Sequence, residues 1–140
     1  MATEQPQKYG VVRRLHHVSL SIPAHTQEQV RTFYGKVLGL EEKPTPESVR
    51  DVNAVWFVLG ENGQELHLIP DTVLPNAEAQ NHFCFDVDDL DTYRGRLLKA
   101  GYEVIDPTPV PNRPRFFCLD PFGNRIEFTT ITGPYYEDYI

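Results

Sequence analysis

The sequence predicts an α+β fold built from two similar modules, and three observations support this prediction. The chain has 140 residues, and its 8 Phe, 7 Tyr and 1 Trp supply enough apolar bulk for a sizeable core. Residues 56–68 align with residues 116–128 without a gap, apolar against apolar and glycine against glycine. Both halves also contain a segment with strand-like alternation followed by a segment with a helical apolar stripe.

The first strand of each half is predicted from period-two alternation. Residues 17–22 alternate between a polar set and an apolar set, and residues 82–87 repeat the pattern with His82 in the place of His17. Ser19 then corresponds to Cys84 and Ser21 to Asp86. Such alternation is typical of a strand that has one face against a core and the other face free.

A helix follows each first strand. The apolar residues recur at helical spacing, which predicts one buried stripe on each helix. Gly39 and Gly101 are expected to end the two helices. The stripe of the first helix contains Val30, Phe33, Tyr34, Val37 and Leu38, and that of the second contains Leu90, Tyr93, Leu97 and Leu98.

The last two strands of each half are predicted to form a hairpin. Asp120-Pro-Phe-Gly123 has the composition of a type I turn, and Gly60-Glu-Asn-Gly63 occupies the matching place in the first half. Prolines are concentrated at 44–46 and 107–114, between helix and hairpin, where an exposed or edge strand tolerates them. We therefore expect one domain over residues 1–140, with modules at about 12–70 and 80–131 and tails at 1–10 and 133–140.

Composition excludes several classes of function. The 20 acidic and 13 basic residues give a net charge of −7 without a basic cluster, so nucleic acid is not an expected partner. No apolar run approaches the ~20 residues that cross a bilayer, and the first residues lack a signal-peptide pattern, so we expect a cytoplasmic protein that binds no membrane. Cys84 and Cys118 form no C-x-x-C pair, which indicates reduced thiols without a cysteine metal site.

The repeat places four potential metal ligands at equivalent positions. His17 and His82 begin the polar faces of the two first strands, and His67 and Glu127 correspond in the two last strands. Strand parity puts all four on the face away from the helices. If the two modules pack side by side into a curved sheet, these side chains offer three imidazoles and a carboxylate to one ion, which suits Zn, Ni, Co, Fe or Mn.

The motifs resemble those of the vicinal oxygen chelate superfamily, which includes glyoxalase I, extradiol dioxygenases, fosfomycin resistance enzymes and bleomycin-binding proteins. The resemblance extends from about Leu15 to Thr129. It is carried by the strings LHHVSL at 15–20, FYGKVLGL at 33–40, ELHLI at 65–69, NHFCFDV at 81–87 and DPFGNRIE at 120–127. It implies paired βαβββ modules that form a cup-like mixed sheet with helices outside, around a divalent metal.

By this resemblance His17, His82 and Glu127 match the strongest ligand positions. The fourth ligand stays open between Glu65, which glyoxalase I-like enzymes favour, and His67, which the internal repeat favours. We prefer His67, and Glu127 and Glu65 are then the candidate catalytic bases. Arg125, Ser19 and Cys84 on the same face are expected to contact the substrate. Arg113 and Arg115 either bind a substrate anion or belong to a solvated loop.

The resemblance implies an enzyme of the glyoxalase I type, an isomerase or lyase that acts on a small molecule chelated through adjacent oxygens. An oxidoreductase of the extradiol dioxygenase type with Fe or Mn is an alternative, although those enzymes are usually about twice as long. A metal-free binding protein of the bleomycin resistance type is a third interpretation. A homodimer is expected, and the modules pair either within one chain or between two chains.

Overall fold

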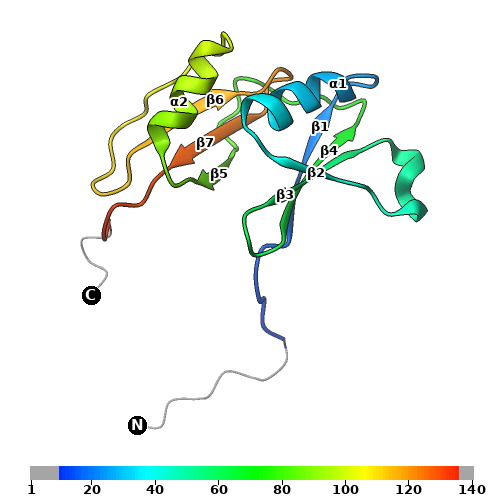
Figure 1. Cartoon of the computed structure of the whole chain (residues 1–140), viewed down its shortest axis with the longest axis horizontal. Helices are drawn as coiled ribbons and strands as arrows, with labels where there is room; N and C mark the ends of the chain where they lie inside the picture. The colour runs from blue at the N-terminus through cyan, green and yellow to red at the C-terminus, as the bar shows by residue number, and fades with distance from the viewer. Residues whose placement is uncertain (1–9, 136–140) are drawn as a thin grey trace.

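The computed structural model describes residues 10–135 and has the predicted α+β architecture, with two separate mixed sheets (Figure 1). The predicted tails at 1–10 and 133–140 lie mostly outside the described residues. In the described part of the chain, no helix is long and apolar enough to cross a membrane.

The first sheet has the strand order β1-β4-β3-β2. Strand β1 (His17–Ile22) pairs in parallel with β4 (Gln64–Pro70), whereas β3 (Val55–Leu59) is antiparallel to both β4 and β2 (Glu41–Lys43). β2 is a three-residue edge strand that stops before Pro44, as the proline pattern predicts, and a 3₁₀-helix (Glu47–Val52) follows it.

The second sheet has the order β5-β7-β6. Strand β5 (Phe83–Asp86) is parallel to β7 (Arg125–Thr129), and β6 (Arg115–Leu119) is antiparallel to β7. Where β2 would be expected, the second half has a single bridge between Ile105 and Phe117. The prolines after Ile105 explain this difference, because they lack the N–H groups that a longer ladder needs.

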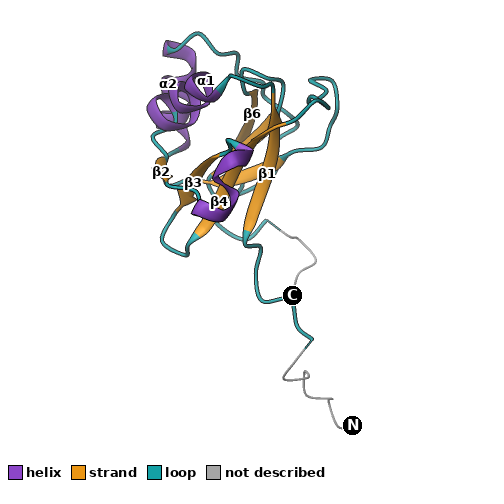
Figure 2. Cartoon of the chain, turned by 90° about the vertical axis from the view of Figure 1, so that its right-hand side faces the viewer, coloured by secondary structure: helices purple, strands orange, loops and turns teal. Residues whose placement is uncertain are grey.

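The two helices lie next to each other at one end of the molecule (Figures 1 and 2). α1 (Gln27–Val30) continues as a π-helical segment (Arg31–Val37), and α2 spans Leu90–Lys99. Gly39 and Gly101 follow them with φ of +78° and +88°, so both helices end at a left-handed glycine as predicted. The predicted buried stripe is confirmed except at Leu98, whose 54% exposure shows that α2 packs over a narrower arc.

One core joins the two halves. The apolar residues of both helices and of the helix-facing sides of both sheets form a single cluster, with Phe33, Tyr34, Phe57, Leu66, Leu68, Leu97, Phe116, Ile126 and Phe128 all fully buried. A buried hydrogen bond crosses between the halves, since the Tyr34 hydroxyl donates to Oδ2 of Asp120 at 2.7 Å. The opposite, polar faces of the two sheets are therefore free for a functional site.

The gapless alignment of the hairpins is wrong by one residue in their first strand. Trp56 pairs with His67, but the residue that pairs with Glu127 is Phe117, not Phe116. The cause is the turn, which contains residues 60–63 in the first half and residues 120–124 in the second. The correspondence of the last strands holds, because His67 lies opposite Ser19 just as Glu127 lies opposite Cys84.

Candidate metal and substrate site

The first half contributes a stack of aromatic rings on the polar face of its sheet. The ring of His67 lies 3.8 Å from that of Trp56 and 4.3 Å from that of His17, and it is nearly parallel to both. The parallel pairing of β1 with β4 produces this arrangement, because His17 is opposite Glu65 and His67 is opposite Ser19, which places the two histidines on the same face two positions apart. His16 adds a contact of 3.0 Å between its Nδ1 and that of His17.

Glu65 lies beside this stack and is fully engaged. One carboxylate oxygen is 2.8 Å from Nε2 of His67, and the other accepts a hydrogen bond from Nζ of Lys43 at 2.6 Å. The bond from Lys43 and the bond with His67 lower the pKa of Glu65 to about 2. Such a carboxylate is a weak base at neutral pH, so it is better suited to orient His67 than to accept a proton.

Burial lowers the pKa of His67, despite its hydrogen bond with Glu65. His67 is only 5% exposed. Because its pKa lies below the ordinary value of 6.5, its imidazole is neutral at pH 7. A neutral imidazole is the form that binds a metal.

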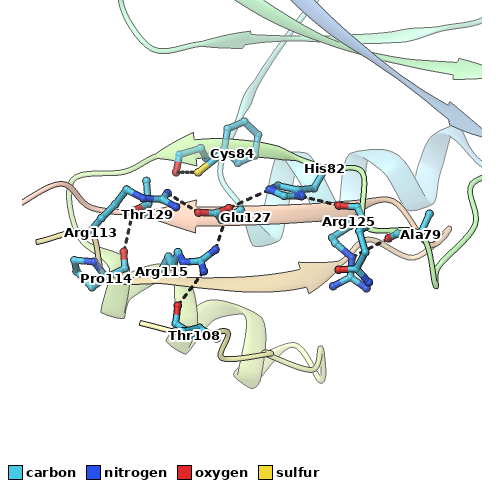
Figure 3. Close-up of polar contacts among 12 residues, drawn as sticks. Ala79, His82, Cys84, Thr108, Arg113, Pro114, Arg115, Arg125, Glu127 and Thr129 are labelled. Carbon is cyan, nitrogen blue, oxygen red and sulfur yellow. Dashed lines mark hydrogen bonds and ion pairs between the residues drawn. The ribbon is translucent and has the colours of Figure 1, made fainter. Parts of the chain in front are cut away.

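The second half contributes His82 and Glu127 (Figure 3). Nε2 of His82 is 3.1 Å from one carboxylate oxygen of Glu127, and the carbonyl of Gln80 lies 2.8 Å from the other ring nitrogen. Glu127 is 3% exposed, and it also contacts Arg113 at 2.6 Å and Arg115 at 3.6 Å. The buried carboxylate thus has the imidazole and the more distant Arg115 guanidinium at one oxygen and the Arg113 guanidinium at the other.

The three predicted substrate contacts differ in how available they are. The guanidinium of Arg125 donates to the carbonyls of Ala79 and Ala77 and so fixes the segment before β5. Ser19 and Cys84 are exposed on the polar face. Desolvation and the neighbouring Glu127 raise the pKa of the Cys84 thiol to about 12, so it is not a nucleophile at neutral pH.

The predicted ligands occur as two pairs, His17 with His67 and His82 with Glu127. Among residues 10–135, no group of three or more His, Cys, Asp or Glu side chains is arranged to hold a metal ion. A cleft of about 990 Å³ lies next to both pairs, with His17, Glu65, His82 and Cys84 on its lining. Much of the remaining lining is apolar and includes Val18, Leu40, Leu59, Phe83, Phe85 and Tyr93.

The donor set fits a divalent transition metal in its chemistry. Imidazole nitrogens with one or two carboxylates suit Zn, Fe, Mn, Co or Ni, whereas Ca and Mg require mostly oxygen ligands. His67 and His82 each have a hydrogen bond of the kind that orients metal-binding imidazoles: a carboxylate oxygen of Glu65 pairs with His67, and the carbonyl of Gln80 accepts from His82.

Four further residues belong to this site through contacts that the sequence does not predict. The gapless alignment matches Trp56 with the wrong residue of the second half, whereas the hairpin register places it opposite His67 on the polar face. Lys43, which pairs with Glu65, belongs to no sequence motif. The expectation of a solvated loop at Arg113 and Arg115 is wrong, since their side chains are only 19% and 17% exposed and both contact Glu127.

Comparisons with known proteins agree with this architecture. A family model described as the glyoxalase/bleomycin resistance protein/dioxygenase superfamily matches residues 14–128. The structure resembles a Bacillus anthracis protein described as a glyoxalase family protein, with 36% identity, a TM-score of 0.79, and coverage of 88% of this chain and 98% of the other. No curated protein sequence matches the chain.

Two further solved structures share the fold at lower identity. The fosfomycin resistance protein FosX from Listeria monocytogenes has 17% identity and a TM-score of 0.70, with 85% of this chain and 91% of the other covered. Lactoylglutathione lyase from Agrobacterium tumefaciens has 23% identity and a TM-score of 0.65, with coverage of 86% and 95%.

Proposed function

Because the chain belongs to the glyoxalase/bleomycin resistance protein/dioxygenase superfamily, we propose that it is a divalent-metal-dependent enzyme acting on a small molecule with adjacent oxygens. The reaction is an isomerisation or lyase reaction of the glyoxalase I type. The observation that carries this proposal is the presence of two imidazole-containing pairs at equivalent positions of the two halves, His17 with His67 and His82 with Glu127.

In this proposal His17, His82 and Glu127 hold the metal, and His67 is the fourth ligand. Glu65 then orients His67, as its hydrogen bond and its lowered pKa favour. A bound metal would polarise the chelated substrate oxygens and stabilise negative charge that develops on them. Glu127 is the candidate for moving the proton on the neighbouring carbon, and the low pKa of Glu65 makes it the weaker candidate.

We further propose that the complete site is formed by two chains. The two pairs do not combine into a group of three ligands in the described part of one chain, which favours a homodimer in which the first half of one chain meets the second half of its partner. The exposed edges of β1 and β5 beside the apolar cleft are consistent with such a contact.

The decisive experiment is elemental analysis of the purified protein after reconstitution with Zn, Mn, Fe, Co or Ni. We expect about one ion per chain, and His82→Ala should abolish binding while far-UV circular dichroism stays unchanged. His25→Asn is the matched control, because His25 is outside the site and its φ of +64° is one that Asn tolerates. His67→Ala and Glu65→Ala, measured in the same assay, identify the fourth ligand.

A second candidate function is small-molecule binding without a metal. It is favoured by one observation: each carboxylate of the site already has a cationic partner, Lys43 for Glu65 and Arg113 for Glu127. Absence of stoichiometric metal after reconstitution would support this function and refute the enzyme proposal.

A further inference from the structure

Positive charge exceeds negative charge around Glu127. Two guanidinium groups share this one carboxylate, with Nη1 of Arg113 at 2.6 Å from one oxygen and Nη1 of Arg115 at 3.6 Å from the other. Both arginine side chains are more than four-fifths buried. This local excess contrasts with the net charge of −7 for the whole chain. Partly buried cations are stable only when they have anionic partners, and one carboxylate cannot fully neutralise both guanidinium groups.

Arg115 in particular has unused hydrogen-bonding capacity. Its Nη2 donates to the carbonyl of Thr108 at 2.9 Å, but its Nη1 is too far from Glu127 for a hydrogen bond. Its Nε is buried and has no hydrogen-bond partner, and it is the single such side-chain atom among the residues that the structure describes. A buried donor without an acceptor in a native fold needs an explanation, and an absent ligand is one.

The position of the two arginines is fixed by the fold. Arg115 begins β6, where its guanidinium lies 5.6 Å from the centre of the Phe117 ring, and Arg113 lies over the ring of Tyr135 at 5.5 Å. In Figure 3 the side chain of Arg115, from β6, and that of Arg113, from the segment before β6, both extend toward Glu127. Two preoriented guanidinium groups that both approach one carboxylate match an oxyanion, which accepts paired N–H···O bonds.

We propose that Arg113 and Arg115 form an anion-binding pocket for the substrate, which therefore carries a carboxylate, phosphonate or phosphate group next to its chelated oxygens. This inference rests on the proposed metal site in one respect. When Glu127 binds a divalent ion, its negative charge is shared with that ion, and the two arginines need another anion. The substrate group supplies it.

The test removes the anionic partner of the two arginines by mutation, in the absence of metal. Glu127→Gln removes the carboxylate that now occupies them, so the metal-free variant is expected to bind inorganic phosphate or oxalate at least about tenfold more tightly than the metal-free wild type, as measured by isothermal titration calorimetry. Adding Arg115→Gln to this variant should remove the gain, and Arg113→Gln, which lies outside the strands, should do the same.

Arg94→Gln, added to Glu127→Gln, is the control. Arg94 is an arginine of α2 that pairs with Asp106 away from the site, so phosphate affinity should not change. Preference for phosphate or for oxalate assigns the substrate group as a phosphonate-type or a carboxylate anion. No gain in Glu127→Gln, or a gain that survives both Arg113→Gln and Arg115→Gln, would overturn the anion pocket. Failure of the wild type to bind metal would instead refute the proposed function, and the Glu127→Gln comparison would still decide the anion pocket.

Discussion

The hydrogen bond between Tyr34 and Asp120 is the clearest test of how the two halves are held together. Tyr34 is fully buried, and its hydroxyl donates to a carboxylate that is 4% exposed, at 2.7 Å. In Tyr34→Phe the ring remains, and Asp120 keeps three other donors, namely the N–H groups of Phe122 and Asn124 and the amide of Asn124. The variant therefore loses one charged hydrogen bond without leaving the carboxylate bare.

A hydrogen bond to a charged group contributes about 1.5–3 kcal/mol, and this is the expected loss in the free energy of unfolding. For a chain of this length the corresponding fall in Tm is roughly 5–12 °C. Urea denaturation at fixed protein concentration, followed by circular dichroism, measures the change.

Tyr93→Phe is the matched control. The Tyr93 ring packs 5.7 Å from that of Phe128, and its hydroxyl has no hydrogen-bond partner among the described residues, so the change should stay within about 0.5 kcal/mol. If Tyr34→Phe is no less stable than Tyr93→Phe, the hydrogen bond between Tyr34 and Asp120 does not hold the halves together.

Three further predictions concern the helix ends, the pH dependence and the site. Gly101→Ala should lower the free energy of unfolding by about 1–2 kcal/mol, because Gly101 has a φ of +88°. Gly95→Ala within α2 should raise it by about 0.5–1 kcal/mol, because a Cβ there meets nothing within 4 Å. Urea midpoints of the two variants that move in the same direction would contradict this pair of predictions. Burial lowers the pKa of His67 below its ordinary value of 6.5, so the unfolded chain takes up the proton first, and the stability that His67 contributes is complete above that pH and is lost as the pH falls. His67→Gln should flatten the dependence of the urea midpoint on pH between 7 and 5, and an unchanged slope would exclude this role. Zn²⁺ should change the fluorescence of Trp56, the only tryptophan, because Trp56 stacks on His67; His67→Ala should remove the change, and a persistent change would place the metal elsewhere.

The internal repeat and the two periodicities predict most of the fold, because they depend on local pattern. They place both helices, the left-handed glycines that end them and the hairpins. The pairing registers of the hairpin strands are harder to predict from the sequence. The second hairpin has one more turn residue than the first, and this shifts the register of its first strand. No local sequence pattern shows that the two turns differ in length. For this reason the gapless alignment matches Trp56 with the buried Phe116 instead of with Phe117.

Of the residues in the candidate site, some are likewise predictable from local pattern and others are not. His17, His67, His82 and Glu127 could be predicted because they repeat at equivalent positions, and the structure groups them as two pairs. The sequence leaves Arg113 and Arg115 open between anion binding and a solvated loop and does not predict Lys43 at all, because each of the three reaches a carboxylate from another strand or loop. Their importance depends on burial and on long-range ion pairs, which a single sequence does not reveal.

A mixing experiment shows whether one metal site combines the first half of one chain with the second half of another, as we propose. His17→Ala and Glu127→Ala are each expected to bind no stoichiometric metal. When equal amounts are unfolded together and refolded, half of the dimers contain both variants, and each of these has one intact site, so metal content should recover to about one quarter of the wild-type value. If each chain forms its site alone, or if these residues bind no metal, the mixture will bind no more than the separate variants.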